Sequence, residues 1–219
     1  MNPESAAAFV LAHTRLVRPP QVPELRLHLA EEAFGLWKRT EEEVGHPGAP
    51  PPYWAFAWPG GQALARYVLD HPSVVLGRSV FDLGSGSGLV AIAAARAGAS
   101  VVNASDVDAF AIAAIGLNAE ANGVSVGCAL EDLLEGDGVD ADVVLAGDLF
   151  YERPTAERVL RFLKRVEARG ADVLVGDPGR AYMPRPGFEA LATYDVVTPP
   201  GLEDRGLKVT NVWRPVGRP

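Results

Sequence analysis

The chain has 219 residues, 48% of them hydrophobic, and a formal net charge of −8. This length and apolar content fit one domain with a sizeable core, and the acidic balance disfavours a nucleic-acid partner. The single cysteine, Cys128, excludes an internal disulfide framework. The sequence shows neither a secretory signal nor the run of roughly 20 apolar residues that a membrane helix needs. We therefore expect a cytoplasmic protein with no membrane partner.

The first 59 residues are predicted to form an extension that packs on the core. Prolines interrupt this region at positions 19, 20, 23, 47 and 50–52. Residues 5–17 are predicted to form a short helix. Residues 24–43 mix apolar and charged side chains, and this pattern fits either a helix or a strand.

From residue 60 onward, helices and strands are predicted to alternate. Gly98 is placed to end one helix and Asp108 to cap the start of the next. The helices are expected at residues 61–69, 88–97, 108–121 and 154–168, and the strands between them at residues 79–83, 100–104, 125–128, 142–146 and 171–176. Short apolar strands that alternate with helices indicate an α/β fold with a parallel sheet covered on both faces.

The end of the chain shows a different pattern. Residues 193–198 and 207–214 read as two strands with no helix between them, and Pro199, Pro200 and Gly201 favour a turn. We expect the two strands to pair at one edge of the sheet. The complete prediction is a Rossmann-like, doubly wound sheet of seven strands, mostly parallel with an antiparallel edge strand.

A glycine-rich loop follows the first strand of the alternating region. Asp82 lies in that strand, and Gly84, Gly86 and Gly88 precede the next helix. Ligands of open parallel sheets bind at such strand ends, and a helix N-terminus favours an anion. Leu89 stands where a dinucleotide-binding loop would have its third glycine, and the lysine of a P-loop is absent. The spacing resembles motif I of class I methyltransferases, whose cofactor is S-adenosylmethionine, and residues 60–219 would form that domain.

Two acidic residues after the following strands are candidate contacts for the same cofactor. Asp106 lies 20 residues after Gly86, at a strand tip where a carboxylate can accept hydrogen bonds from both ribose hydroxyls. We assign the capping role to Asp108 and the ribose to Asp106. Methyltransferases of this class often place an acidic residue near the adenine amine, which suggests Asp132, although an exposed acidic turn explains this residue nearly as well.

The fourth strand of the alternating region ends in Asp148 and leads to Tyr151. Enzymes that methylate the amino groups of DNA or RNA bases often carry two prolines here, and this chain has none. The pattern D-x-x-Y resembles a motif of the seven-β-strand protein-lysine methyltransferases. Further segments sharpen the resemblance, namely YWAFAWPGGQAL at residues 53–64, GDPGR at residues 176–180 and VTNVW at residues 209–213. Together they resemble the family of lysine methyltransferases of the electron transfer flavoprotein β-subunit and its bacterial relatives.

The resemblance implies roles for further residues. Trp58, Gly60 and Gly61 would form part of the cofactor wall, while Trp54 is more readily explained as a core residue. Asp148 and Tyr151 would be catalytic, because a carboxylate can receive the lysine ammonium and orient the amine, and Tyr151 can supply a wall or a hydroxyl. At the end of the fifth strand, Asp177 and Arg180 would lie on the substrate side. Arg180 could hold a carboxylate of the substrate or of a neighbouring loop, or form a structural pair with Asp177.

The acceptor implied by the resemblance is a lysine of another protein, first the electron transfer flavoprotein β-subunit and second a ribosomal stalk protein. Three alternatives remain open. They are a small-molecule N-methyltransferase acting on a nicotinamide-like substrate, an NAD-dependent oxidoreductase, and a scaffold that has lost catalysis. Because the four histidines, at positions 13, 28, 46 and 71, have no metal-ligand spacing, we expect no metal.

Overall fold

The computed structural model describes residues 2–198 and 206–216. Its centre is a seven-stranded sheet with the strand order β5-β4-β3-β6-β7-β9-β8. The first five strands of this order run parallel to one another, and β9 is antiparallel to both β7 and β8. The strands are β3 (Ser79–Leu83), β4 (Val101–Asp106), β5 (Gly127–Leu130), β6 (Val143–Gly147), β7 (Asp172–Asp177), β8 (Phe188–Val197) and β9 (Leu207–Pro215). The predicted sheet is therefore confirmed, with the antiparallel strand one place inside the edge.

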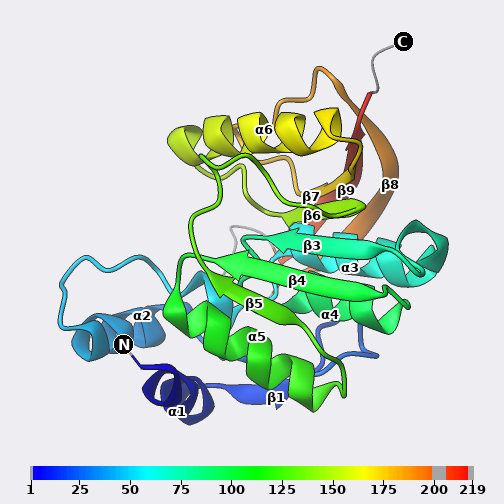
Figure 1. Cartoon of the computed structure of the whole chain (residues 1–219). Coiled ribbons are helices and arrows are strands. Elements are labelled where there is room, and N and C mark those ends of the chain that lie inside the picture. Colours follow the sequence, from blue (N-terminus) through cyan, green and yellow to red (C-terminus); the bar gives the residue numbers. More distant parts are fainter. Residues whose placement is uncertain (1, 199–205, 217–219) are drawn as a thin grey trace.

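Helices cover both faces of this sheet (Figure 1). One face packs against α6, and the other packs against α3 and α4, with α5 beside them. The helices are α1 (Pro3–His13), α2 (Ala33–Val44), α3 (Pro59–Asp70), α4 (Leu89–Arg96), α5 (Ala109–Ala121) and α6 (Arg153–Ala168), with short 3₁₀ turns at Tyr53–Ala55 and Pro72–Val74. None of the described helices is long and apolar enough to cross a membrane.

Strand β3 shows why its sequence is apolar throughout. Val80 belongs to the core cluster shared with α3 and α4, whereas Phe81 belongs to the cluster shared with α6. Side chains alternate between the two faces of a strand, so a strand covered on both faces needs apolar residues at consecutive positions. The bounds of β3 are those that the sequence predicted.

The helix caps also follow the sequence. The side chain of Asp108 accepts a hydrogen bond from the backbone nitrogen of Phe110, at 2.8 Å, and caps α5. Gly98 has a positive φ of 92° just beyond the end of α4, a conformation that glycine adopts without a steric cost. The paired strands near the C-terminal end are confirmed as β8 and β9, while the expected turn at residues 199–201 lies outside the described residues.

The N-terminal region departs from the sequence prediction. The helix expected over residues 5–17 ends at His13, and Arg15–Val17 forms strand β1, which pairs antiparallel with β2 (Leu27–Leu29). The hydroxyl of Thr14 donates to the backbone oxygen of Val10, at 2.6 Å, where the helix ends. Residues 24–43, which fitted either structure, contain both β2 and most of α2.

Strand β2 is tied to the glycine loop through one buried side chain. The Oδ1 atom of Asn118 accepts from the backbone nitrogen of His28, at 2.6 Å, and its Nδ2 atom donates to the backbone oxygen of Ser87, at 2.8 Å. The N-terminal segment is therefore linked to the loop through Asn118 of α5. The division of the chain into an extension and a domain at residue 59 stays a prediction.

Candidate functional site

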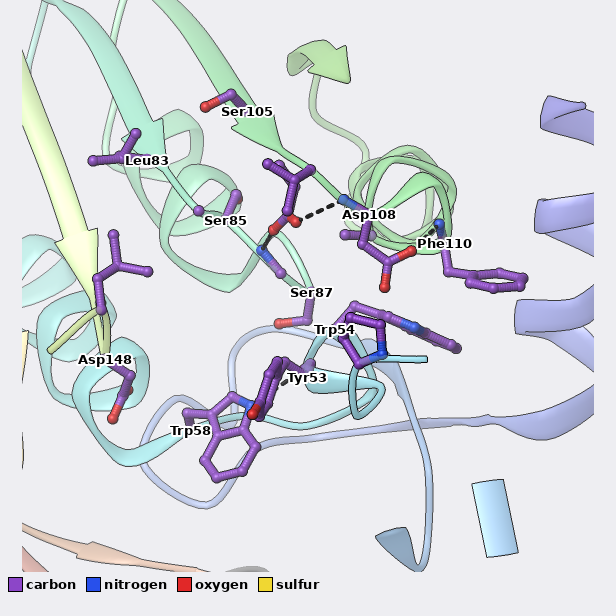
Figure 2. Close-up of a pocket in the computed structure, with 18 of the residues that line it drawn as sticks. Tyr53, Trp54, Trp58, Leu83, Ser85, Ser87, Ser105, Asp108, Phe110 and Asp148 are labelled. Atoms are coloured by element: carbon purple, nitrogen blue, oxygen red, sulfur yellow. Dashed lines mark hydrogen bonds between the residues drawn. The ribbon is translucent and has the colours of Figure 1, made fainter. Parts of the chain in front are cut away.

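A pocket of about 1140 Å³ opens at the carboxyl ends of β3, β4 and β6 (Figure 2). Strand order reverses around β3, since β4 lies on one side of it and β6 on the other. Ligands of doubly wound sheets bind at such a switch point. The pocket is lined by most of the residues singled out in the sequence, namely Trp58, Gly61, Asp82, Gly84, Gly86, Asp106, Asp132, Asp148, Tyr151 and Arg180. Gly60, Gly88 and Asp177 lie behind this lining.

The glycine loop needs glycine for conformation and for space. Gly84, Gly86 and Gly88 all have positive φ, between 56° and 81°. A Cβ atom on Gly84 would lie 2.7 Å from Leu149, and one on Gly88 would lie 3.2 Å from the backbone of Ile115. The loop is therefore packed closely against the side chain of Leu149 and the backbone of Ile115, and it lines the pocket.

Asp82 stabilises this loop through hydrogen bonds. Its Oδ2 atom accepts from the hydroxyl of Ser85, at 2.5 Å, and from the backbone nitrogen of Ala91, at 3.1 Å. The carboxyl group is buried, and this burial raises its pKa to about 7. Asp82 thus joins the end of β3 to the start of α4.

Asp106 supports the opposite side of the loop. Its two carboxylate oxygens accept from the backbone nitrogens of Gly86, at 2.9 Å, and Asp108, at 3.1 Å. The carboxylate lines the pocket, and burial raises its pKa. Asp106 and Asp108 therefore have different roles. Asp106 faces the pocket at the tip of β4, whereas Asp108 caps α5.

Asp132 lies on the pocket wall after β5, but an arginine pairs with it. The Nη2 atom of Arg158, on α6, lies 2.8 Å from its Oδ2 atom, and this bond lowers the pKa of the carboxyl. The backbone nitrogen of Leu134 binds Oδ1. The geometry explains the residue as a turn and ion-pair partner, and leaves its expected contact with an adenine a prediction.

Asp148 is held on both carboxylate oxygens. The backbone nitrogen of Gly61 donates to Oδ2, at 2.8 Å, and the Nη2 atom of Arg180 donates to Oδ1, at 3.0 Å. The residue is also the one non-glycine residue of the described chain with a positive φ, 58°. Burial raises its pKa to about 7, against the opposite effects of Arg180 and Gly61. Arg180 therefore binds the carboxylate of a neighbouring strand tip, one of the roles that the sequence left open.

The backbone of α3 approaches two strand ends closely at this point. A Cβ atom on Gly60 would lie 2.3 Å from the backbone oxygen of Gly176 and 2.6 Å from Oδ2 of Asp148. The glycines of the GG pair thus have different functions. Gly60 allows the close packing, whereas Gly61 faces the pocket and supplies the N–H group that holds Asp148.

Asp177 is fully buried and shapes the loop that carries Arg180. Its Oδ1 atom accepts from the backbone nitrogens of Gly179 and Arg180, both at 2.7 Å. The expected structural pair between the two side chains is therefore replaced by a bond to the backbone of Arg180. Burial raises the pKa of Asp177.

Three aromatic rings form one side of the pocket near Asp148. The ring of Tyr53 lies 5.4 Å from that of Tyr151 and 5.8 Å from that of Trp58. The indole of Trp58 donates to the backbone oxygen of Tyr53, at 2.8 Å, and Figure 2 shows these two residues side by side. No role for Tyr53 was predicted from the sequence. The residue begins the YWAFAWPGG segment, which could have pointed to it, but it follows a proline-rich stretch in which the exposure of a side chain cannot be predicted.

Trp54 combines core packing with a polar atom that lacks a partner. The ring is buried and stacks on Phe110, with centroids 5.9 Å apart. Within the described part of the chain its Nε1 atom has no hydrogen-bond partner, and the residue lines the pocket. This atom is closed off from solvent, so the indole serves mainly to pack the core, and its unpaired donor is costly.

These features fit S-adenosylmethionine. The ligand has an amino-acid end and a nucleoside end, so it needs hydrogen-bond donors, an acceptor for ribose hydroxyls and an apolar floor. The glycine loop lines the pocket with its backbone and with Ser87, Asp106 offers the acceptor, and Leu133 and Leu134 offer apolar surface. Carboxylates also suit a ligand that carries positive charge.

Comparison with known proteins agrees with this geometry. Residues 63–151 match the family of ribosomal protein L11 methyltransferases (PrmA). The chain is 37% identical over 212 residues to the electron transfer flavoprotein β-subunit lysine methyltransferase of Xenopus laevis, and the match covers 94% of this chain and 85% of that protein. The human protein of the same name is 37% identical over 220 residues, with 97% and 82% covered.

Solved structures support the fold. The magnesium protoporphyrin IX methyltransferase of Synechocystis, solved with bound S-adenosylmethionine, superposes with a TM-score of 0.51 at 21% identity, over 71% of this chain and 78% of that one. Fold, pocket and relatives together define a class I methyltransferase that depends on S-adenosylmethionine. Its similarity to the full-length relatives is specific enough to go further. The chain belongs to the family of electron transfer flavoprotein β-subunit lysine methyltransferases, and it is a protein-lysine methyltransferase.

Proposed function

We propose that this enzyme methylates lysine side chains of the electron transfer flavoprotein β-subunit. The relatives that carry this substrate in their names match nearly the whole chain. The observation that carries the proposal is the position of Asp148, a carboxylate on the wall of the pocket that Tyr151 and Trp58 also line. A carboxylate beside an aromatic wall suits a long aliphatic side chain that ends in an amine.

In this proposal, different parts of the pocket bind different parts of the cofactor. The loop from Gly84 to Gly88 binds the amino-acid end through backbone groups, Asp106 binds the ribose, and Asp132 contacts the adenine. Trp58 and Gly61 form the wall near the sulfonium end. When bound, S-adenosylmethionine supplies a methyl group that the sulfonium charge has already activated.

The acceptor amine is positioned by the chain. Asp148 accepts hydrogen bonds from the amine, so that its lone pair faces the methyl carbon, and Tyr151 limits where the side chain can lie. Such positioning converts an encounter of two molecules into a step within one complex, and a closed, water-poor pocket prevents competing reactions. A pocket of low polarity also favours the neutral amine, which is scarce in water because lysine has a pKa near 10.4.

The proposal is tested with purified flavoprotein β-subunit, S-adenosylmethionine and the wild-type enzyme, followed by peptide mass spectrometry. We expect methyl groups on specific lysines, which also maps the acceptor. Nicotinamide forms a parallel arm, and methylation of nicotinamide without methylation of the β-subunit would support the small-molecule alternative. A nucleic-acid acceptor remains disfavoured by the acidic charge.

A ribosomal protein is a second candidate acceptor. The ribosomal protein L11 methyltransferase of Bacillus pumilus is 39% identical over 103 residues, yet the match covers only 29% of that enzyme. The family model of these enzymes matches residues 63–151, a stretch that holds the glycine loop, Asp106 and Asp148. Ribosomal protein L11 therefore belongs in the same assay, with slower methylation than the β-subunit as the expected result. A cytoplasmic location, expected from the single cysteine, is part of the proposal.

A further inference from the structure

Arg180 occupies the carboxylate that the acceptor amine is proposed to use. Its Nη2 atom lies 3.0 Å from Oδ1 of Asp148, and its Cζ atom lies 5.7 Å from the centre of the Trp58 ring. Only 20% of the Arg180 side chain and 10% of the Asp148 side chain are exposed. Since Gly61 binds Oδ2, both oxygens of Asp148 are already engaged, one of them by a cation.

The loop geometry keeps Arg180 in this position. Asp177 binds the backbone nitrogens of Gly179 and Arg180, so the loop enters the site with a fixed direction. The guanidinium is always charged at physiological pH. Its charge favours the ionised form of Asp148, against the burial that raises the pKa of that carboxyl to about 7.

An incoming lysine ammonium would therefore meet a cation at close range. The negative charge of Asp148 is matched by Arg180, and the sulfonium of the bound cofactor adds further positive charge on the other side. Among the described residues, the other ionisable groups around this part of the site include Tyr53, Tyr151, Glu152, Asp106, Asp177 and, farther along the loop, Arg185. A neutral amine meets no such repulsion, and it can still donate N–H bonds to the lone pairs of Asp148 that Arg180 and Gly61 leave unused.

We propose that Arg180 is the specificity-determining residue that makes the site accept the acceptor lysine in its neutral form. This inference rests on the proposed function and adds the protonation state that the site selects. The lysine loses its proton to solvent as it binds. In the transfer itself, the lone pair of the amine forms the new N–C bond while the S–C bond breaks and leaves its electron pair on sulfur. The positive charge moves to nitrogen, and the methylated amine then loses a proton to solvent before any further transfer.

The test counts protons released on binding. The β-subunit is titrated into enzyme saturated with S-adenosylhomocysteine, by calorimetry at about pH 8 in two buffers of different ionisation enthalpy. At this pH nearly all free lysine is protonated, so binding as the neutral amine releases about one proton per complex. We expect that number for the wild type, and less than half of it for Arg180→Met, in which the ammonium can pair with Asp148. When the mapped lysine of the β-subunit is replaced by methionine, binding of this β-subunit to the wild-type enzyme should release no proton.

Two further variants separate charge from structure. Arg180→Lys keeps the positive charge and should release about as many protons as the wild type. Arg185→Met removes an exposed arginine of the same loop that has no contact with Asp148 among those described, and it should also match the wild type. If Arg180→Met does not fold, Arg180→Gln takes its place. In either variant, the affinity for S-adenosylhomocysteine should stay within a few-fold of the wild-type value.

Turnover gives an independent measurement. In Arg180→Met the bound lysine should hold its proton more tightly, so kcat should fall about tenfold at neutral pH and recover in alkaline solution, a shift of about one pKa unit. A purely structural loss would lower kcat equally at all pH values. The inference is overturned if wild-type binding releases no proton, or if Arg180→Met releases as many as the wild type. Failure of the proposed function gives a different result, since the wild type would then neither bind nor methylate the β-subunit.

Discussion

The backbone nitrogen of Gly61 donates a hydrogen bond to the carboxylate of Asp148, at 2.8 Å, although 87 residues separate the two in the chain. Gly61 lies in the first turn of α3, where the helix dipole and free N–H groups stabilise a negative charge. The bond fixes the tip of β6 against the start of α3. It thereby sets the direction of the carboxylate that faces the pocket.

Asp148→Asn should separate catalysis from cofactor binding. Asparagine has the same shape and tolerates the positive φ of 58° found at this position, so the fold should be kept, although its one amide oxygen can accept from Gly61 or Arg180 but not from both. We expect the affinity for S-adenosylhomocysteine to stay within a few-fold and turnover to fall by about 10² or more, because the amine loses the group that orients it. Steady-state kinetics beside calorimetry check this expectation. Retained turnover would reject the assigned role.

Gly60→Ala and Gly61→Ala form a matched pair for the packing of α3. The added Cβ at Gly60 would lie 2.3 Å from a backbone oxygen, whereas at Gly61 its nearest neighbours are side-chain atoms 3.8 and 3.9 Å away. Gly60→Ala should destabilise the protein by about 1–3 kcal/mol. Gly61→Ala should leave stability equal or raise it by about 0.5–1 kcal/mol, because alanine favours a helix. Thermal unfolding measures both, and equal midpoints would contradict the close approach.

Asp106→Ala should weaken cofactor binding more than it weakens the fold. The variant loses the proposed ribose acceptor and frees the backbone nitrogen of Gly86, which the carboxylate holds at 2.9 Å. We expect the dissociation constant of S-adenosylhomocysteine to rise by about 10- to 100-fold, in line with the loss of charge-assisted hydrogen bonds. Asp132→Ala is the comparison, and a small effect there would leave that residue as the ion-pair partner of Arg158 only.

Stability of the cofactor-free protein should fall as pH rises from about 4 to 7. Burial raises the pKa of Asp82 from its usual 3.8 to about 7, so within this interval the folded protein holds a proton that the unfolded chain has lost. The protonated carboxyl contributes stability below the lower value, and this contribution is lost as pH rises through the upper one. Asp148, with a pKa also near 7, and Asp108, near 6, act in the same direction.

Asp82→Asn isolates one of these groups. Its amide stays neutral at all pH values, so the decline of the unfolding free energy between pH 5 and 7.5, measured by urea denaturation, should be shallower than in the wild type. An unchanged slope would show that Asp82 titrates normally in the folded protein.

Tyr53 should matter for the acceptor rather than for the cofactor. Its ring contacts those of Tyr151 and Trp58, and 41% of the residue is exposed at the pocket. Tyr53→Ala should raise KM for the protein substrate severalfold, because the aliphatic stem and the cationic product lose an aromatic surface. Tyr53→Phe keeps the ring and should behave like the wild type. Equal KM values for both variants would exclude this function.

The regular part of the fold could be predicted because local signals agree with it. Strand β3 is a mainly apolar run that leads into a glycine loop, and helix α5 begins directly after its cap Asp108, so sequence alone places both. Strand β1, at Arg15–Val17, shows the limit. This strand depends on pairing with Leu27–Leu29, a contact that no local pattern announces, and the helical pattern before it was extended too far.

Most residues of the candidate site were predicted from the sequence, but the hydrogen bonds and the ion pair that join them were not. Strand tips bring Asp106 and Asp148 to one pocket because parallel strands end at the same edge. The pair of Asp148 with Arg180 joins two different strand tips, and it depends on the course of the loop after β7. The contact of Gly61 with Asp148 depends on how α3 packs on the sheet, which sequence spacing does not encode.

Calorimetric titration with S-adenosylhomocysteine tests the central claim most directly, since every assignment depends on the glycine loop holding a nucleoside of this kind. The account predicts saturable binding of one ligand per chain to the wild type, weakened in Asp106→Ala and kept in Asp148→Asn. A wild-type protein that is folded and yet gives no binding to S-adenosylhomocysteine or S-adenosylmethionine would contradict the account.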